Sequence, residues 1–374
     1  MAPLDGVLVL DFSTLLPGPM ATLLLAEAGA EVIKIERPDG GDEMRRYAPK
    51  LGPDSVNFGL LNRGKRSLAL DLKDEAARET LRPLVERADV LVEQFRPGVM
   101  DRLGLGYAAL REVNPGLIYC SITGYGQNGP KAGIAAHDLN YIAEVGLLGL
   151  SAGADGAPVV PPALIADIAG GSWPAVINIL LALHERSRTG EGRHLDVSMT
   201  DNLFPFLYWA LGNAFAGGGW PRPGGELVTG GSPRYAIYRT RDGRHLAAAP
   251  LEERFWRRFT ELIGLAEPLR DDREDPAATR TAIAAIIEGH DAAHWQQVFK
   301  GEDVCCSIVA TLEEALSEPH VAARGLFAQE LRAPDDQRIP ALPLPLDAAF
   351  RGPGEAGFPR LGEADVREFV RENR

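Results

Sequence analysis

Cysteine is scarce in this sequence. The chain of 374 residues contains three cysteines, Cys120, Cys305 and Cys306. An odd number with one adjacent pair does not make a disulfide framework, and the spacing fits no zinc-binding motif. We therefore expect a protein of a reducing compartment, the cytoplasm, with no bound metal.

The sequence also lacks a long hydrophobic run and an excess of positive charge. No apolar run reaches the ~18 residues of a membrane-spanning helix, and the first residues carry no secretory signal. Acidic residues outnumber basic ones by 52 to 39, which gives a net charge of -13. Phosphate-rich nucleic acids attract the opposite balance. We expect neither a membrane nor a nucleic acid as a partner.

A glycine-rich dinucleotide fingerprint is missing where the expected fold would carry it. Residues 6–12 and 31–36 are predicted strands, and residues 20–28 are the helix between them. This spacing is that of a parallel β-α-β crossover. The turn after the first strand reads Pro17-Gly18-Pro19 in place of G-x-G-x-x-G, so the sequence gives little support for NAD binding.

Strands and helices continue to alternate after this first unit. Residues 67–72, 89–95 and 117–123 are predicted strands, with helices at 74–88 and around 107–113. Near-continuous apolar strands that alternate with helices indicate a mostly parallel sheet covered on both faces. The length exceeds that of a usual single domain, so we expect two domains.

One stretch rich in glycine and proline is interpreted as a linker between the domains. After it, Asp242-Gly243 predicts the turn of an antiparallel hairpin. We expect an α/β fold in four segments: a large Rossmann-like domain (1–215), the linker (216–232), a smaller α+β domain (233–325) and a C-terminal segment that returns to the large domain (326–374).

A His-Asp pair and a later Asp are the candidate chemical groups. His137 and Asp138 precede an apolar segment, and Asp167 precedes another at 172–183. An imidazole exchanges a proton near neutral pH, and a carboxylate among small apolar residues can do the same or attack an electrophile. Each Asp also fits the role of a helix cap. The residues alone leave both interpretations open.

Basic residues gather near the ends of the predicted strands. Ligands of such sheets bind beyond the carboxyl ends of the strands, and Arg and Lys suit phosphates. The bases are Arg37, Lys73, Arg96 and Arg102, with Arg63, Lys65 and Arg66 before the third strand. They could form an anion site, or a solvated surface paired with Glu36, Asp71, Glu93 or Asp101.

Eight short phrases, in order along nearly the whole chain, carry a family resemblance. They are LLPGP (15–19), KIERP (34–38), NRGKRS with DLK (62–73), EQFRPG (93–98), GYGQ (124–127), AD (166–167), TGEG (189–192) and EPH (318–320). Together they resemble the family III CoA-transferases, which include the α-methylacyl-CoA racemases.

The resemblance implies a Rossmann-like large domain and a homodimer whose subunits interlock as linked rings. The active site would then lie between the large domain of one subunit and the small domain of the other. Coenzyme A (CoA) would be part of an acyl-CoA substrate, with no separate cofactor. The implied CoA contacts are Arg37, Leu70, Lys73, Gln94, Arg96, Arg102, Lys131 and Tyr141.

Two branches of this family use the same aspartate differently. In the transferases, the residue that matches Asp167 is the nucleophile. In the racemases it is one of two proton-transfer groups; the other matches His137, which is held by the match of Asp138 and lies near the match of Glu252. The phrase HDxNY (137–141) resembles the racemase motif. The resemblance favours an isomerase that epimerises a 2-methylacyl-CoA through an enolate, with CoA transfer between carboxylic acids as the alternative.

Overall fold

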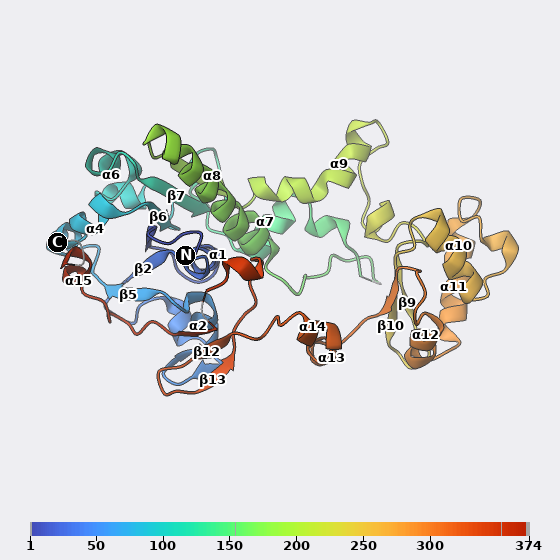
Figure 1. The fold of residues 1–374 in the computed structure, drawn as a ribbon. Coiled ribbons are helices and arrows are strands. Elements are labelled where there is room, and N and C mark those ends of the chain that lie inside the picture. The colour runs from blue at the N-terminus through green and yellow to red at the C-terminus, as the bar shows by residue number, and fades with distance from the viewer. Residues whose placement is uncertain (1, 154, 353, 372–374) are drawn as a thin grey trace. The chain divides into compact units, whose positions relative to one another are not determined.

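A computed structural model describes residues 2–153, 155–352 and 354–371 (Figure 1). The chain divides into two compact units. The first contains Met1–Val145, Pro162–Pro205 and Ala322–Arg374, and the second contains Gly146–Pro161 and Phe206–Val321. The four-segment division expected from the sequence stays a prediction, and the second unit begins before the expected linker.

Six parallel strands form the central sheet of the first unit. They are β1 (Leu8–Asp11), β2 (Glu31–Glu36), β5 (Arg66–Ala69), β6 (Val90–Glu93), β7 (Ile118–Thr123) and β8 (His194–Ser198). Their order is β5-β2-β1-β6-β7-β8, and each neighbouring pair is parallel. The expected parallel sheet is confirmed. The order reverses between β1 and β6, which is where such sheets bind ligands.

Helices cover both faces of this sheet (Figure 1). Those of the first unit include α1 (Pro17–Glu27), α2 (Val56–Asn62), α3 (Glu75–Thr80), α4 (Arg82–Arg87), α5 (Val99–Arg102), α6 (Tyr107–Val113), α7 (Asp138–Glu144), α8 (Trp173–Thr189) and α15 (Val366–Arg371). Helices α4 and α6 pack with strand residues such as Leu10 and Leu91 in one buried cluster. The helix expected over 74–88 is interrupted at Leu81, because Pro83 lacks the N–H that a continuous helix needs there.

Short strands that the sequence did not predict cover one end of the first unit. They are β3 (Lys50–Leu51), β4 (Asp54–Ser55), β12 (Glu330–Arg332), β13 (Arg338–Pro340) and β14 (Glu355–Gly357). Leu331 and Phe358, from the C-terminal part of the chain, pack against Phe58 of α2 in a small apolar cluster. Segments of two or three residues are too short for an alternation pattern to reveal them.

The second unit has its own sheet and core. It contains β9 (Ala236–Arg239), β10 (His245–Ala248), β11 (Cys306–Ile308), α9 (Tyr208–Phe215), α10 (Glu253–Leu262), α11 (Pro276–Glu288), α12 (Ala292–Val298) and α13 (Leu312–Leu316), and α14 (Pro319–Ala323) spans its boundary. The predicted hairpin is confirmed, since β9 and β10 pair antiparallel around Asp242-Gly243. Trp256, Phe259 and Trp295 fill the core.

Two buried ion pairs lie beneath the loop between β1 and α1. Lys65 Nζ lies 3.1 Å from Asp11 Oδ2, and Lys34 Nζ lies 3.0 Å from Asp42 Oδ2, with all four side chains fully buried. Lys34 Nζ also donates to the Ser13 carbonyl at 2.7 Å. These pairs tie the loop to the sheet.

Three of the bases that the sequence offered for an anion site are used in other contacts. Lys65 is paired with Asp11, Arg63 lies 3.6 Å from Glu27, and Arg66 pairs with Glu368 and Glu31. Arg63 and Lys65 are buried, so the anion-site hypothesis is wrong for these two bases, and for the partly exposed Arg66 it stays a prediction. Their partners lie far away in sequence, so residue spacing gave no sign of them.

One helix among the described residues is long and apolar enough, by length and composition alone, to cross a membrane. Ala166–Thr189 has 24 residues and a window of mean hydropathy 1.4, of which 39% is buried. This corrects the expectation that no segment would reach that length. A single helix of this kind is weak support for a span, because core helices meet the same test. The predicted absence of a membrane partner stays a prediction.

Replacing Asp11 by Asn should strongly destabilise the fold, because Lys65 would be left as an unpaired buried charge. We expect a loss of about 3 kcal/mol in the free energy of unfolding, measured by urea denaturation. The matched control is Arg82→Ala, which breaks the exposed Arg82–Glu86 pair and should cost less than about 0.5 kcal/mol. Equal losses in both variants would contradict the prediction.

Candidate functional site

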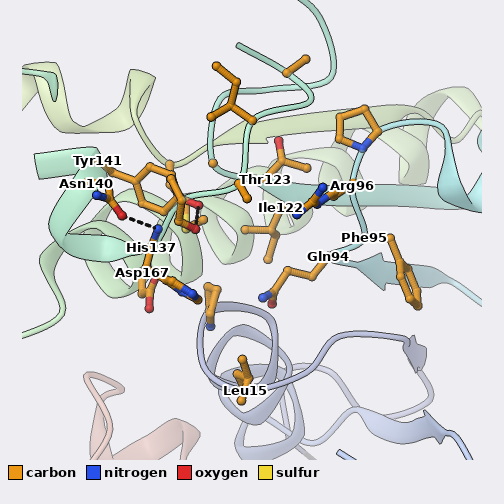
Figure 2. Close-up of a pocket in the computed structure, with 18 residues that line it drawn as sticks. Leu15, Gln94, Phe95, Arg96, Ile122, Thr123, His137, Asn140, Tyr141 and Asp167 are labelled. Carbon is orange, nitrogen blue, oxygen red and sulfur yellow. Dashed lines mark hydrogen bonds between the residues drawn. The ribbon is translucent and has the colours of Figure 1, made fainter. Parts of the chain in front are cut away.

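A pocket of about 390 Å³ lies where the strand order reverses (Figure 2). Its walls come from the ends of β1, β6, β7 and β8 and from the start of α7. The lining residues are Leu15, Pro17, Gln94, Phe95, Arg96, Pro97, Ile122, Thr123, Gly124, Ala132, Ile134, Ala135, Ala136, His137, Asn140, Tyr141, Asp167 and Met199. All of them belong to the first unit.

Asp167 lies in a π-helical turn, Ala166–Ser172, that continues into α8. Two glycines allow this turn to pack closely, since a Cβ on Gly170 would lie 2.5 Å from the Met199 carbonyl oxygen. Ser172 Oγ donates to the Pro17 carbonyl at 2.8 Å. The turn is therefore fixed against the start of α1. Such π-helical turns occur frequently at functional sites.

Asp138 connects the two candidate catalytic segments. It is buried at the first position of α7, with His137 as the preceding N-cap residue. Its Oδ1 atom accepts a hydrogen bond of 3.0 Å from the backbone N–H of Asp167. The hypothesis that Asp138 caps its own helix is therefore wrong, because its carboxylate satisfies a free N–H of the turn that carries Asp167.

The Asp167 carboxyl has a pKa raised from its ordinary value of 3.8 to about 7. Burial is the larger cause, because it disfavours the charged form, and the negative charge of Asp138 adds to it. Protonated and ionised forms are then both populated near neutral pH. A carboxyl group in this state can either remove or donate a proton.

His137 lines the same pocket from an exposed position. Its backbone N–H donates to Asn140 Oδ1 at 3.0 Å. The hydroxyl of the buried Tyr141 donates to the Ala136 carbonyl at 2.7 Å. Both bonds hold the chain around His137 against α7. In Figure 2, His137, Asn140, Tyr141 and Asp167 are grouped on one side of the pocket.

Three of the implied CoA contacts, Gln94, Arg96 and Tyr141, line the pocket. Gln94 Oε1 accepts the Gly18 N–H at 3.0 Å, which ties the turn after β6 to the first turn of α1. Arg96 is exposed. Figure 2 shows Gln94 and Arg96 across the pocket from His137 and Asp167.

The other implied contacts lie outside this pocket. Arg37, Lys73, Arg102 and Lys131 are exposed. Arg37 Nε donates to Gly41 O at 2.8 Å, and Lys131 Nζ lies 2.5 Å from Glu144 Oε2. Leu70 lines a separate apolar cavity beside α15. Glu252 belongs to the second unit, at the N-terminal end of α10.

Several lining residues were not identified from the sequence. Leu15, Thr123 and Met199 follow or end a strand of the sheet, so the rule that ligands bind beyond strand ends could have indicated them. Leu15 also has a left-handed backbone with φ of 62°, which is rare for a residue with a side chain. No sequence pattern predicts that conformation.

Comparison with known proteins fits this geometry. A family model described as CoA-transferase family III matches residues 4–365. The chain belongs to this family. Family III membership agrees with the parallel sheet and with the pocket at its switch point, and it confirms the resemblance drawn from the eight phrases.

Characterised relatives of this family III chain include both branches. It is 35% identical over 350 residues to α-methylacyl-CoA racemase of Homo sapiens, covering 92% of this chain and 86% of that one. It is 36% identical over 380 residues to acetyl-CoA:oxalate CoA-transferase of Acetobacter aceti, covering 98% and 96%. A crystal structure of a CAIB/BAIF family protein from Brucella suis has a TM-score of 0.84 at 30% identity, covering 99% of each chain.

The family III pocket combines a carboxyl group with a pKa near neutrality and an imidazole on the same wall. Both groups can exchange protons with a substrate bound in the pocket. The carboxylate alone can also attack a thioester carbonyl. The geometry of the site therefore supports an acyl-CoA enzyme of either branch.

Replacing Asp167 by Asn should stabilise the protein at high pH but not at low pH. With a pKa of about 7 against 3.8 for an ordinary Asp, the folded chain binds more protons than the unfolded chain between these pH values. Wild-type stability should thus fall as pH rises from about 4 to about 7, and Asn removes this loss.

We expect Asp167→Asn to exceed wild type by about 1–3 kcal/mol at pH 8 and to equal it at pH 4, in urea unfolding at both values. Asp39→Asn, at an exposed position, is the control and should show no such pH-dependent difference. An identical difference for Asp167→Asn at both pH values would contradict the assignment.

Proposed function

We propose that this chain is an isomerase that epimerises the α-carbon of a 2-methylacyl-CoA, with Asp167 and His137 as the acid/base pair. The observation that carries the proposal is their presence in one pocket, with the Asp167 carboxyl near pKa 7. An enzyme that works in both directions needs groups that can exchange roles. A carboxyl group with a pKa near 7 can both remove and donate a proton, and imidazole is the side chain that most often does so near neutral pH.

The proton balance of this reaction is simple. Ionised Asp167 removes the α-proton from one epimer, and the electron pair of the C–H bond moves into an enolate. Protonated His137 then donates its proton to the opposite face of the same carbon. The reverse reaction starts from neutral His137 and protonated Asp167. Arg96, exposed on the other wall, supports binding of the CoA phosphates.

CoA transfer between carboxylic acids is the second candidate, favoured by 36% identity to acetyl-CoA:oxalate CoA-transferase. The ionised Asp167 carboxylate would attack the thioester carbonyl and release the CoA thiolate, leaving a mixed anhydride. The thiolate would attack the Asp167 carbonyl of the anhydride, freeing the first acid and forming an aspartyl thioester. The second acid would then receive CoA through the same steps in reverse. The steps of this reaction require no acid or base from the His137 side chain.

We further propose that the enzyme is a cytoplasmic homodimer in which Glu252 of the partner subunit orients His137, with CoA entering only as part of the substrate. Large apolar side chains on α8 support a protein partner: Trp173, Ile177 and Leu181 are 42%, 57% and 62% exposed. Apolar residues spread along one helix in this way often mark an interface.

The homodimer proposal predicts a solution mass of twice 40.3 kDa. Light scattering coupled to size exclusion would measure it, without detergent and with a mild detergent. We expect the same dimer in both conditions. A monomer would contradict the proposal, and a particle that appears only with detergent would favour burial of α8 in lipid.

The two chemistries are separated by proton NMR in D2O with a 2-methylacyl-CoA and no acceptor acid. We expect deuterium to enter the α-carbon with the wild type and to fall at least about 100-fold with either His137→Ala or Asp167→Ala. The matched controls are His184→Ala and Asp39→Ala, which change an exposed histidine and an exposed aspartate outside the pocket.

A transferase would give another pattern. Without an acceptor no deuterium would be incorporated, and an added carboxylic acid would receive CoA. That transfer would survive His137→Ala and be abolished by Asp167→Ala. This result would replace the racemase proposal with the transferase alternative.

A further inference from the structure

Glu93 is a buried carboxyl group without a basic partner. It is the last residue of β6, with 4% of its surface exposed. Among the residues that the structure describes, no lysine or arginine forms an ion pair with it, and no base contributes to the shift of its pKa. The sequence had offered Glu93 as a possible surface partner of nearby bases. The structure places its side chain in the interior instead.

The Glu93 carboxylate is joined to the backbone of the next turn and to the neighbouring strand. Oε2 accepts the Phe95 N–H at 2.8 Å. The Ser121 hydroxyl, on β7, also hydrogen-bonds to the carboxylate. Ser121 Oγ lies 2.9 Å from Nε2 of His194, whose ring stacks on Tyr107. Glu93 thus links the turn to a fixed polar chain across β6, β7 and β8.

The turn held by Glu93 forms one wall of the pocket. Residues 94–97 all line it. Gln94 is fixed at its side chain by the Gly18 N–H. Among the described residues, the Arg96 guanidinium forms no hydrogen bond or ion pair, so its direction depends on the backbone of the turn. The bond between Glu93 and Phe95 N–H, one residue before Arg96, sets that backbone.

The position of Glu93 is costly for the fold. Burial raises the pKa of its carboxyl to about 7, and the charges of Asp101 on α5 and Asp196 on β8 add to the shift. The titratable or polar groups that interact electrostatically with it from the neighbouring elements are these two carboxylates, the Ser121 hydroxyl, the Cys120 thiol and the Tyr119 hydroxyl. A buried carboxyl without a counter-charge is typical of functional sites.

We propose that Glu93 is a positioning residue for CoA: by accepting the Phe95 N–H, it holds residues 94–97 in the shape that presents Gln94 and Arg96 to the substrate. This inference rests on the proposed function, because a CoA ester must bind in the pocket. It does not depend on which branch of the family the enzyme follows.

The test compares Glu93→Gln with Glu93→Met by calorimetric titration with free CoA and by steady-state kinetics. The Gln side chain keeps an oxygen that accepts the Phe95 N–H, whereas Met has a similar length and no such acceptor. We expect Glu93→Met to raise the Kd for CoA and the KM for the acyl-CoA about five- to tenfold, with kcat within about twofold. For Glu93→Gln, the Kd for CoA, the KM for the acyl-CoA and kcat should each stay within about twofold of the wild-type value.

Cys120→Ser is the matched control for a general loss of stability. Cys120 is fully buried on the neighbouring strand and does not line the pocket. The Cys120→Ser variant should have a lower melting temperature than wild type and an unchanged Kd for CoA. If Glu93→Met behaves in the same way, with a lower melting temperature and wild-type affinity, the positioning role is overturned.

A double-mutant cycle with Arg96→Met tests whether Glu93 acts through the turn. If it does, Glu93→Met should weaken CoA binding less in the Arg96→Met background than in wild type. Fully additive effects would contradict this route. If Glu93→Met does not fold, Ser121→Ala, which removes the second hydrogen bond to the carboxylate, takes its place. An increase in Kd would then support the role, and an unchanged Kd would overturn it.

Failure of the inference and failure of the proposed function give different results. If the wild-type protein does not bind CoA, the proposed function fails and the positioning role fails with it. If the wild type binds CoA and Glu93→Met binds equally well, only the positioning role is lost.

Discussion

The buried pair of Lys34 and Asp42 is the interaction on which the geometry of the pocket depends. Lys34 Nζ donates to the Ser13 carbonyl, and the Asp42 carboxylate accepts the Leu15 N–H at 3.1 and 3.2 Å. Both charges are excluded from water, so removing either partner would leave the other unpaired at a cost of about 3–5 kcal/mol. The ion pair and its hydrogen bonds therefore hold the loop after β1 in place, with Leu15 in its left-handed conformation.

The rest of the pocket is built on the first turn of α1, which directly follows this loop. The Gly18 N–H donates to Gln94, which fixes the turn after β6, and Pro17 O accepts from Ser172, which fixes the π-helical turn of Asp167. The wall that we assign to CoA and the wall that carries the chemistry therefore share one support. A shift of this support would therefore displace both walls of the pocket.

Many of the strands and helices were predictable because the sequence patterns that indicate them are local. Residues 31–36 match β2 and residues 107–113 match α6, since apolar runs and helical spacing are read within a few residues. The contacts that set the site are not local: Lys65 meets Asp11 across 54 positions, and Asp138 meets the N–H of Asp167 across 29. Chemical type alone thus named Asp167 and His137 as candidates, but it could not show that Asp138 links them.

The Asp138–Asp167 contact also explains how one scaffold can serve two chemistries. The carboxylate of Asp138 holds the backbone of Asp167 in place, and its charge helps to raise the pKa of that side chain to about 7. A pKa near neutrality suits a proton-transfer group, yet it leaves enough ionised carboxylate to act as a nucleophile. Asp167 therefore does not decide between racemase and transferase. The proposed proton transfer needs a second acid/base group in the pocket, and His137, the neighbour of Asp138 in the sequence, is the candidate for it. Because His137 and Asp138 are adjacent, one segment supplies both the carboxylate that bonds to the Asp167 backbone and the imidazole that lines the same pocket.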